Sequence, residues 1–167
     1  MIPLKLRIAG FLSYREPVEL DFTGFDLACI SGHNGAGKSS LLDAITWAVF
    51  GQARKRDDSL VNLQSKAAEV ALTFSYESNV YRIQRTLPRG KTTILEFQVA
   101  DGESWRPLTE KTRSETEARI RQTLRLDYET FVNASFFLQG KADEFTQKKA
   151  SERKAVQIGR ASCRERV

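Results

Sequence analysis

The sequence predicts an α/β fold in which flanking helices cover a mixed sheet that contains an antiparallel meander. Three observations support this prediction: short segments alternate apolar and polar residues, a glycine-rich loop runs into a long apolar helix, and turn residues separate three consecutive strand-like segments. The chain has 167 residues. This is the size of one domain or of part of one, because a core of this size can bury most of its apolar surface.

The N-terminal part of the chain predicts three strands. Residues 4–9 alternate Leu and Ile with Lys and Arg, and residues 18–22 repeat this pattern after a turn at residues 15–17, so we expect the two strands to pair. Residues 27–30 form a continuous apolar run, Leu-Ala-Cys-Ile, which is typical of a strand buried on both faces. In such a strand Cys29 is a small core residue and not a nucleophile.

A helix and the meander follow. Residues 38–50 carry apolar side chains on nearly every side and end at Gly51, which predicts a helix buried under the sheet. Residues 69–76, 80–85 and 92–99 alternate apolar and polar residues and are separated by turn residues. Three antiparallel strands are the simplest interpretation.

The C-terminal third predicts helices. Thr112 and Glu115 have the spacing of a capping box, which predicts a helix of about three turns after them. Asp127 is expected to cap a short helix that runs through Phe131. From Thr146 onward the chain is charged and indicates a further helix.

Composition excludes several classes of protein. Apolar residues make up 41% of the chain and charged residues 28%, with ten Gly and four Pro, which excludes disordered, collagen-like and disulfide-stapled chains. No apolar run reaches the ~18 residues that span a bilayer, and residues 1–5 lack the pattern of a secretion signal. We therefore expect a cytoplasmic protein without a membrane partner, in which Cys29 and Cys163 make a weak case for a disulfide.

The last ten residues differ from the rest. Residues 158–167, IGRASCRERV, resemble the translation of a sequencing adapter, so we expect a non-native tail after a natural sequence that ends at about residue 157. Without the three arginines and one glutamate of this tail, the net charge falls from +5 to +3. Such a charge is compatible with nucleic acid as a partner but argues for it only weakly.

The strongest chemical signal lies at residues 32–39. Their sequence, GHNGAGKS, is a complete G-x-x-x-x-G-K-[ST] phosphate-binding loop. Glycines allow the backbone to form a concavity whose N–H groups point at an anion, and the positive end of the following helix adds to the attraction. A merely glycine-rich turn is the alternative, and the preceding apolar strand and following helix argue against it.

The loop residues have distinct expected roles, with ATP and Mg²⁺ as the cofactors. Lys38 would reach the β- and γ-phosphates as the catalytic cation, Ser39 would bind the Mg²⁺ ion, and Ser40 would contact a phosphate oxygen. The residues expected to bind the nucleotide are Asn34, Gly35, Ala36, Gly37, Lys38, Ser39 and Ser40.

Several motifs together resemble a known family. They are LRIAGFLSY at residues 6–14, GHNGAGKSSLLDAI at 32–45, FGQARKRDDSLVN at 50–62, FFLQGKADEFT at 136–146 and ASERK at 150–154. Over residues 1 to about 157 the chain resembles the N-terminal ATPase half of SbcC, an SMC-like ATPase of a DNA-repair nuclease.

This resemblance implies the fold, a further site residue and the partners. The fold would be that of a P-loop NTPase of the ABC/SMC type, with residues 1–157 forming the N-terminal lobe of a truncated head. Gln139 matches the Q-loop glutamine, which contacts Mg²⁺ and the water at the γ-phosphate and is therefore both a catalytic and a metal-binding candidate. The implied partners are the C-terminal half of the same protein, a second head, an SbcD-type nuclease and DNA. The Walker B acid, the signature motif, the D-loop and the switch histidine would lie in the missing C-terminal half. A long coiled coil with a Cys-x-x-Cys zinc hook would separate the two halves.

Other interpretations remain open. A RecF-like or other SMC-like ATPase would tether or load on DNA without a nuclease, and an architectural DNA-bridging clamp would not be an enzyme. His33, the only histidine, is expected to be a tolerated loop side chain. Two basic groups could contact a DNA backbone or could simply be solvated. They are Arg54, Lys55 and Arg56 on a loop and Arg82, Arg85, Arg89 and Lys91 on a hairpin.

Overall fold

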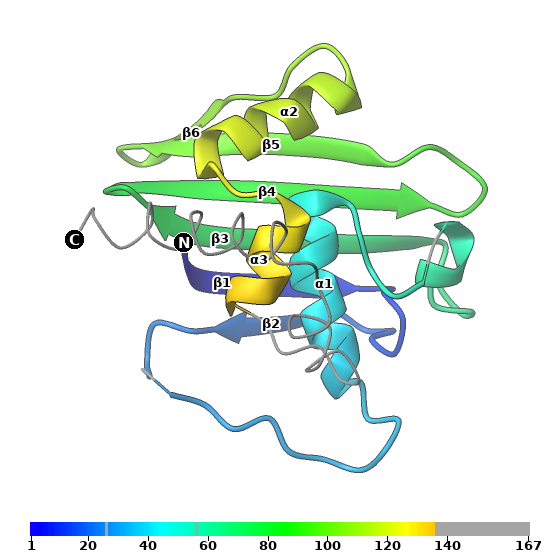
Figure 1. Ribbon diagram of the computed structural model, residues 1–167. Coiled ribbons are helices and arrows are strands. Elements are labelled where there is room, and N and C mark those ends of the chain that lie inside the picture. Colours follow the sequence, from blue (N-terminus) through cyan, green and yellow to red (C-terminus); the bar gives the residue numbers. More distant parts are fainter. Residues whose placement is uncertain (26, 56, 136–167) are drawn as a thin grey trace, which may run out of the picture. The chain divides into compact units, whose positions relative to one another are not determined.

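The computed structural model describes residues 1–25, 27–55 and 57–135 of the chain (Figure 1). The chain divides into two compact units, residues 1–124 and 125–167. The first unit holds a sheet and two helices, α1 and α2. In the second unit, the described residues form one helix, α3 (Tyr128–Ser135).

A six-stranded sheet forms the first unit, with the strand order β2-β1-β3-β4-β5-β6. Every strand pair in it is antiparallel. The strands are β1 (Ile2–Ala9), β2 (Val18–Asp21), β3 (Ala67–Tyr76), β4 (Asn79–Pro88), β5 (Ile94–Asp101) and β6 (Ser104–Pro107).

The sheet confirms most of the strand predictions. Strands β1 and β2 pair with Ile8 opposite Val18, and β3, β4 and β5 form the expected antiparallel meander. The sequence did not predict β6, a strand of four residues that pairs with β5 and ends at Pro107. Because proline has no N–H to donate to a sheet, it marks the end of this strand.

The predicted strand at residues 27–30 is wrong for the part of the chain that the structure describes. These residues form neither a strand nor a helix. Leu27 is 91% exposed and Cys29 is exposed, so the assignment of Cys29 to the core is wrong as well. A continuous apolar strand is buried only when other elements cover both of its faces, and no described strand pairs with this segment. The sheet is therefore antiparallel throughout the described residues and is not mixed.

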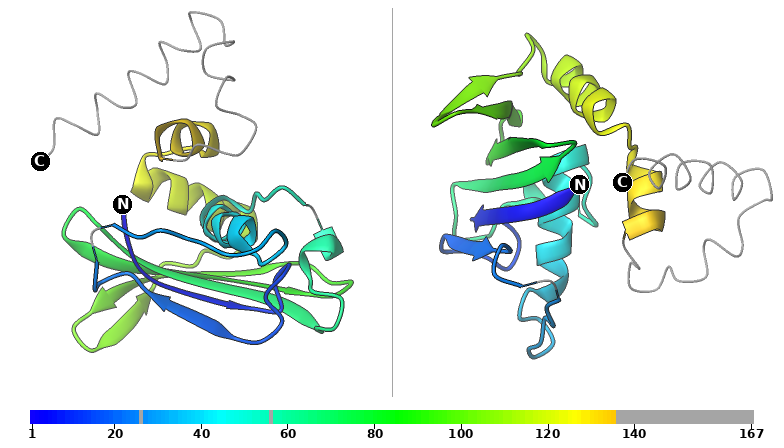
Figure 2. Two further views of the ribbon diagram at one scale, coloured as in Figure 1. Left: turned by 90° about the horizontal axis from the view of Figure 1, so that it is seen from below. Right: turned by 90° about the vertical axis from the view of Figure 1, so that its left-hand side faces the viewer.

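Helix α1 (Lys38–Phe50) matches the predicted helix from end to end. It lies on one face of the sheet, where it contacts β3 and β4 (Figure 2). Trp47 packs against Phe11 with ring centroids 5.2 Å apart. Gly51 ends the helix in a left-handed conformation with φ of 69°, and its N–H donates to the Trp47 carbonyl. A 3₁₀ turn, Asp57–Leu60, follows.

Helix α2 (Arg113–Leu124) covers the same face of the sheet next to β5 (Figure 2). The predicted capping box is present: the N–H of Glu115 donates to Thr112 Oγ1, and the N–H of Thr112 donates to Glu115 Oε2. At the start of α3, the N–H of Thr130 donates to Asp127 Oδ1, which confirms the second predicted cap. None of the described helices is long and apolar enough to cross a membrane.

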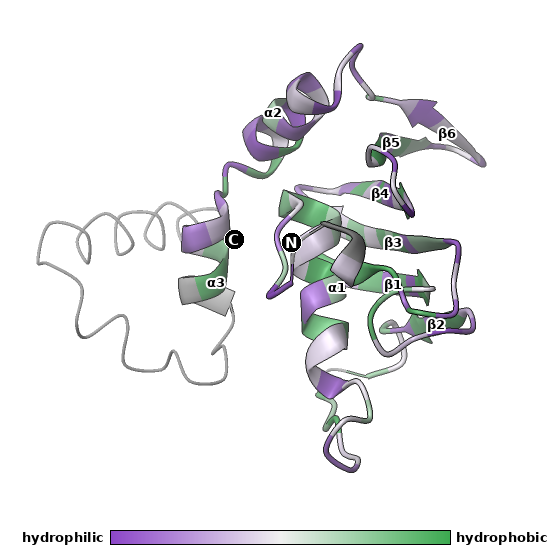
Figure 3. Ribbon diagram, turned by 90° about the vertical axis from the view of Figure 1, so that its right-hand side faces the viewer, coloured by the Kyte–Doolittle hydropathy of each residue, from purple (hydrophilic) through white to green (hydrophobic). Residues whose placement is uncertain are grey.

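Alternation along the strands separates the two faces of the sheet. Leu72, Ile83 and Phe97 occupy paired positions on adjacent strands and are fully buried under the helices. Arg82 and Gln98 face the other way and bond to each other. Figure 3 shows a separate difference between strands, since β1 is largely hydrophobic and β6, at the edge of the sheet, is largely hydrophilic.

Candidate functional site

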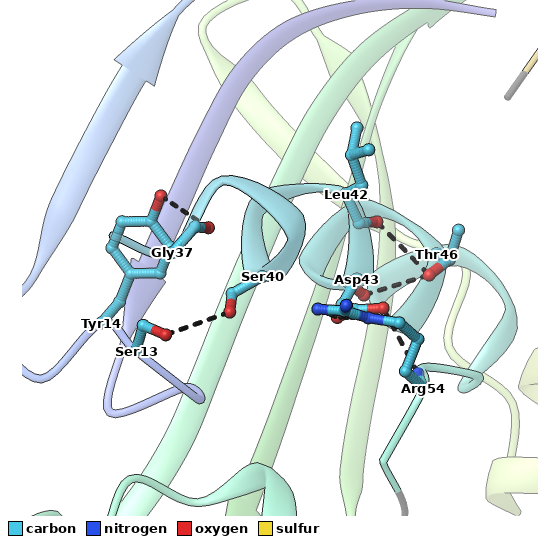
Figure 4. A network of polar contacts seen from close by, with 8 residues as sticks. All are labelled: Ser13, Tyr14, Gly37, Ser40, Leu42, Asp43, Thr46 and Arg54. Atoms are coloured by element: carbon cyan, nitrogen blue, oxygen red, sulfur yellow. Dashed lines mark hydrogen bonds and ion pairs between the residues drawn. The ribbon is translucent and has the colours of Figure 1, made fainter. Parts of the chain in front are cut away.

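The phosphate-binding loop enters α1 through Gly37, where the backbone has φ of 92°. A Cβ atom at this position would lie 3.1 Å from Ser13 Cβ and 3.3 Å from the Tyr14 ring. The Tyr14 hydroxyl donates to the Gly37 carbonyl at 3.4 Å (Figure 4). Burial raises the pKa of Tyr14, which keeps its hydroxyl a donor. Both the backbone conformation and the close approach of Tyr14 therefore require glycine at this position.

Lys38 extends across the loop that precedes it. Its Nζ atom donates to the carbonyl oxygens of Gly32 and His33 at 2.6 and 2.9 Å. An ammonium group has three N–H donors, so these two bonds leave one for another acceptor. The lysine charge is thereby held against the loop at the N-terminal end of α1.

The first turn of α1 is suited to an anion. Helix N–H groups in the first turn have no partner within the helix, and no side chain caps α1. The first turn also contains no acidic residue. Because these N–H groups and the helix dipole give this end a partial positive charge, a phosphate group complements it.

The predicted nucleotide-binding residues lie consecutively around this helix end. Asn34, Gly35 and Ala36 are exposed, and Ser39 lies half-buried in the first turn of α1. Ser40 is buried, and its Oγ atom lies 3.3 Å from Ser13 Oγ (Figure 4). His33 is an exposed loop residue whose carbonyl accepts from Lys38.

Three sequence expectations lie outside the described residues. They are the position of Gln139, the charged helix from Thr146 onward, and the tail of residues 158–167. The role of Gln139 therefore remains a prediction from the resemblance.

An ion pair that the sequence reasoning missed lies on the next turn of α1. The Asp43 side chain is 5% exposed, and both Nε and Nη2 of Arg54 lie 2.7 Å from its Oδ2 atom (Figure 4). The N–H of Arg54 also donates to Asp43 Oδ1. One signal could have found this pair: a lone carboxylate in an otherwise apolar buried helix needs a partner.

A cavity of about 760 Å³ lies beside this part of α1. We call it the loop-side cavity, and its polar lining includes Ser13, Arg15, Ser40, Asp43, Arg54 and Lys55. Arg54 is neutralised by Asp43, and Arg15 pairs with Glu16 at 3.2 Å. Of the cations in the wall, Lys55 forms no ion pair within the part of the chain that the structure describes. Lys55 therefore favours a negatively charged group at one part of the wall, while Leu12, Val61 and Leu63 offer apolar contacts elsewhere in it.

The arginines of the predicted basic group on the hairpin differ in burial and in hydrogen-bond partners. Arg85 is buried, so its assignment to an exposed DNA-contacting group is wrong. Arg82 bonds to Gln98 and lies 4.4 Å from the centroid of the Trp105 ring. Arg89 donates to the carbonyl oxygens of residues 62 and 65.

Comparison with known proteins identifies relatives. Residues 5–161 match the family described as AAA domain. The chain is 34% identical to the SbcC component of the nuclease SbcCD of Deinococcus radiodurans, covering 84% of this chain and 16% of that protein. It is 36% identical to the probable DNA double-strand break repair Rad50 ATPase of Aquifex aeolicus, covering 95% and 16%. The chain thus spans about one sixth of the length of these relatives.

The fold also has solved relatives. The recombination mediator protein RecF-ATPrS superposes with a TM-score of 0.51 at 17% identity, covering 71% of this chain and 29% of that one. This similarity concerns the fold alone. With the family match, it agrees with the P-loop lobe that the sequence predicted.

Proposed function

We propose that this chain, which belongs to the AAA domain family, is the N-terminal lobe of an SMC-like ATPase head that binds ATP with Mg²⁺ and acts in DNA repair. One observation carries the proposal: Lys38 extends across a glycine loop at a helix end that no side chain caps. The SbcC and Rad50 relatives support ATP as the nucleotide and DNA-break repair as the setting.

In this proposal the residues of the chain divide the work of binding the triphosphate. The N–H groups of the loop and of the first turn of α1 hold phosphate oxygens, and Lys38 neutralises charge on the β- and γ-phosphates. The Ser39 hydroxyl and, from the resemblance, Gln139 would hold Mg²⁺, which when bound neutralises phosphate charge and orients its oxygens. Ser39 is half-buried, and the first turn of α1 contains no acidic residue that would bind a metal by itself. This suits a metal that binds together with the nucleotide.

The loop-side cavity extends this site. Ser40 belongs both to the first turns of α1 and to the wall of the cavity. Ser13 and Arg15 line the same cavity and are therefore further candidates to hold a bound nucleotide. The bond from the Tyr14 hydroxyl to the Gly37 carbonyl joins the turn after β1 to the N-terminal end of α1.

Hydrolysis requires groups from outside this chain. We propose that a C-terminal half supplies the acid that polarises the attacking water, that a second head supplies the signature motif, and that an SbcD-type nuclease is controlled by the assembly. The exposed apolar residues Leu27 and Ile30 support the idea of a missing partner, because further strands would bury them. By itself the chain should be poorly soluble or loosely folded, bind ATP weakly and not hydrolyse it.

The first test is Lys38→Ala in the full-length protein. Calorimetry should show loss of ATP binding, because no other cation of the phosphate loop reaches the β- and γ-phosphates. Lys5→Ala is the matched control, since Lys5 lies on β1 and pairs only weakly with Glu19 and Asp21. Unchanged ATP affinity in Lys38→Ala would contradict the proposal.

A second test separates binding from turnover. Gln139→Ala should retain most of the ATP affinity but slow hydrolysis, because a neutral amide positions water and metal and does not anchor the triphosphate. Simultaneous loss of binding and turnover would contradict this role.

The requirement for a second half has its own test. Adding the separately expressed C-terminal half should restore solubility and ATP turnover to the isolated chain. Hydrolysis by the isolated chain, abolished in Lys38→Ala, would show that the catalytic acid lies within it.

A further inference from the structure

A second cavity, whose lining is mainly polar, lies at the opposite end of α1 from the phosphate-binding loop. It has a volume of about 610 Å³ and lies where the end of α1, the hairpin between β4 and β5, and the start of α2 come together. We call it the basic cavity. Its charged lining consists of Lys55, Arg85, Lys91, Arg113 and Glu117.

Arg85 forms the innermost part of this wall. It is 1% exposed, and its Nε donates to the Ala48 carbonyl at 2.8 Å. Its Nη1 donates to Glu117 Oε1 at 2.9 Å. Its Nη2 atom is also buried and has no hydrogen-bond partner among the described residues. Leaving a guanidinium N–H buried without an acceptor costs free energy. A ligand that supplied an acceptor for Arg85 Nη2 would remove this cost.

The carboxylate in the cavity is shared by two guanidinium groups. Glu117 Oε1 accepts from Arg85 and also lies 3.7 Å from Arg113 Nε. Lys55 and Lys91 form no ion pair within the part of the chain that the structure describes. Four cations therefore face one carboxylate and the weak negative charge of a helix C-terminus, roughly half a charge. The positive charge in the cavity is undercompensated.

The backbone permits this arrangement because α1 ends in glycine. A Cβ atom on Gly51 would lie 3.1 Å from Arg85 Nη1 and 3.3 Å from Glu117 Oε1. Any larger residue would therefore press on the ion pair. The guanidinium of Arg85 is thus fixed from α1 and α2 together, which is the kind of preorganisation that favours binding.

We propose that the basic cavity binds an oxyanion of the phosphate class. Arg85 and Arg113 offer planar N–H donors that match phosphate oxygens, and Lys55 and Lys91 add charge at the opening. The anion would compensate the positive charge of the cavity that Glu117 does not neutralise. Free phosphate and a phosphate of a nucleic acid strand share this chemistry. The site lies at the other end of α1 from the phosphate-binding loop, and Lys55 is the one charged residue that lines both this cavity and the loop-side cavity.

The test is inorganic phosphate binding to the full-length protein carrying Lys38→Ala, measured by calorimetry at constant ionic strength. The Lys38→Ala background removes the phosphate-binding loop as a competing site. We expect saturable binding that Arg113→Gln weakens about tenfold, because a charge-assisted hydrogen bond is lost. Arg106→Gln is the charge-matched control and should change the affinity by less than about twofold, since Arg106 is exposed on β6 and pairs with Asp101.

A second variant tests the buried arginine itself, and Arg113→Gln, at a side chain that is 55% exposed, remains informative if this change in the core destabilises the protein. Arg85→Lys keeps the buried charge but loses the planar donors and should also weaken phosphate binding, while circular dichroism remains unchanged. No saturable phosphate binding, or equal effects of Arg113→Gln and Arg106→Gln, would overturn the proposal. A DNA oligonucleotide that displaces phosphate identifies a nucleic acid strand as the source, and failure to displace it identifies a free anion.

Discussion

The meander of β3, β4 and β5 and the segment at residues 27–37 differ in how their backbone is paired. In the meander, every strand has neighbours on both sides, and Phe74, Ile83 and Phe97 are fully buried. In the segment, Leu27 is 91% exposed, and residues 27–30 belong to no strand. Consecutive hairpins complete their own hydrogen bonds, whereas an isolated apolar strand depends on partners from elsewhere.

The phosphate-binding loop joins this segment to α1, which packs on β3 and β4. Its C-terminal end is fixed by the contacts of Gly37 with Ser13 and Tyr14 and by the bonds of Lys38. Ser13 and Tyr14 follow β1, so the sheet positions the helix end that would bind phosphate. Contacts from the sheet side thus fix the end of the loop, and within the loop the carbonyl oxygens of Gly32 and His33 accept from Lys38.

The largest expected effect is in the meander, with Phe97→Ala. Phe97 is fully buried and stacks on Tyr81 with ring centroids 5.6 Å apart. Its truncation should cost about 3–5 kcal/mol, from lost burial and the cavity that is left. Hydrogen exchange should show loss of protection in β4 and β5. Ile94→Ala, at an exposed position on the same strand, is the control, and an equal effect of the two variants would mean that the meander is not a packed core.

The next largest effect is expected with Gly37→Ala, where the phosphate-binding loop enters α1. The positive φ and the contacts with Ser13 and Tyr14 should together cost about 1–3 kcal/mol and should weaken ATP binding as the loop shifts. Gly90→Ala is the matched control, because Gly90 has φ of 69° but nothing within 4 Å of its Cβ position. Calorimetry with ATP should therefore separate the two variants. Equal ATP affinities would show that the close approach of Tyr14 does not position the loop.

Local signals in the sequence were sufficient for much of this structure. The ends of α1 follow from Gly37 and Gly51, and the capping box of Thr112 and Glu115 has the predicted bonds. These features depend on residues close together in the chain. The same holds for the meander, because short turns leave few alternative pairings.

The sequence reasoning failed where the outcome depends on distant residues. The pairing of Asp43 with Arg54 depends on the path of the loop after α1. The strand predicted at residues 27–30 lacks the neighbours that its composition requires. Arg85 was assigned to the surface, although alternation along β4 places it on the same face as the buried residues Ile83 and Leu87. That alternation was a signal that could have been used.

A smaller effect is expected at the start of α2, with Thr112→Ala. This change removes the hydroxyl that accepts from the N–H of Glu115, and it should cost about 1 kcal/mol. Hydrogen exchange should rise in the first turn of α2 while the meander keeps its protection. Thr123→Ala is the control, since the Thr123 hydroxyl only bonds to a carbonyl within the helix. Equal exchange in the two variants would mean that the capping box does not stabilise α2.

In the isolated chain the smallest effect is expected with Leu27→Ser, and this variant tests the comparison directly. In the isolated chain, a residue that is 91% exposed buries almost nothing, so the substitution should change the free energy of unfolding by less than about 0.5 kcal/mol. In the full-length protein, the proposed partner strands would bury Leu27, and the same substitution should then be destabilising by about 2–3 kcal/mol. Thermal unfolding of each form, with Leu63→Ser as a second exposed leucine for control, measures the difference. If Leu27→Ser were neutral in both forms, no partner strands would bury residues 27–30 in the full-length protein. The exposure of this segment would then not result from missing partner strands.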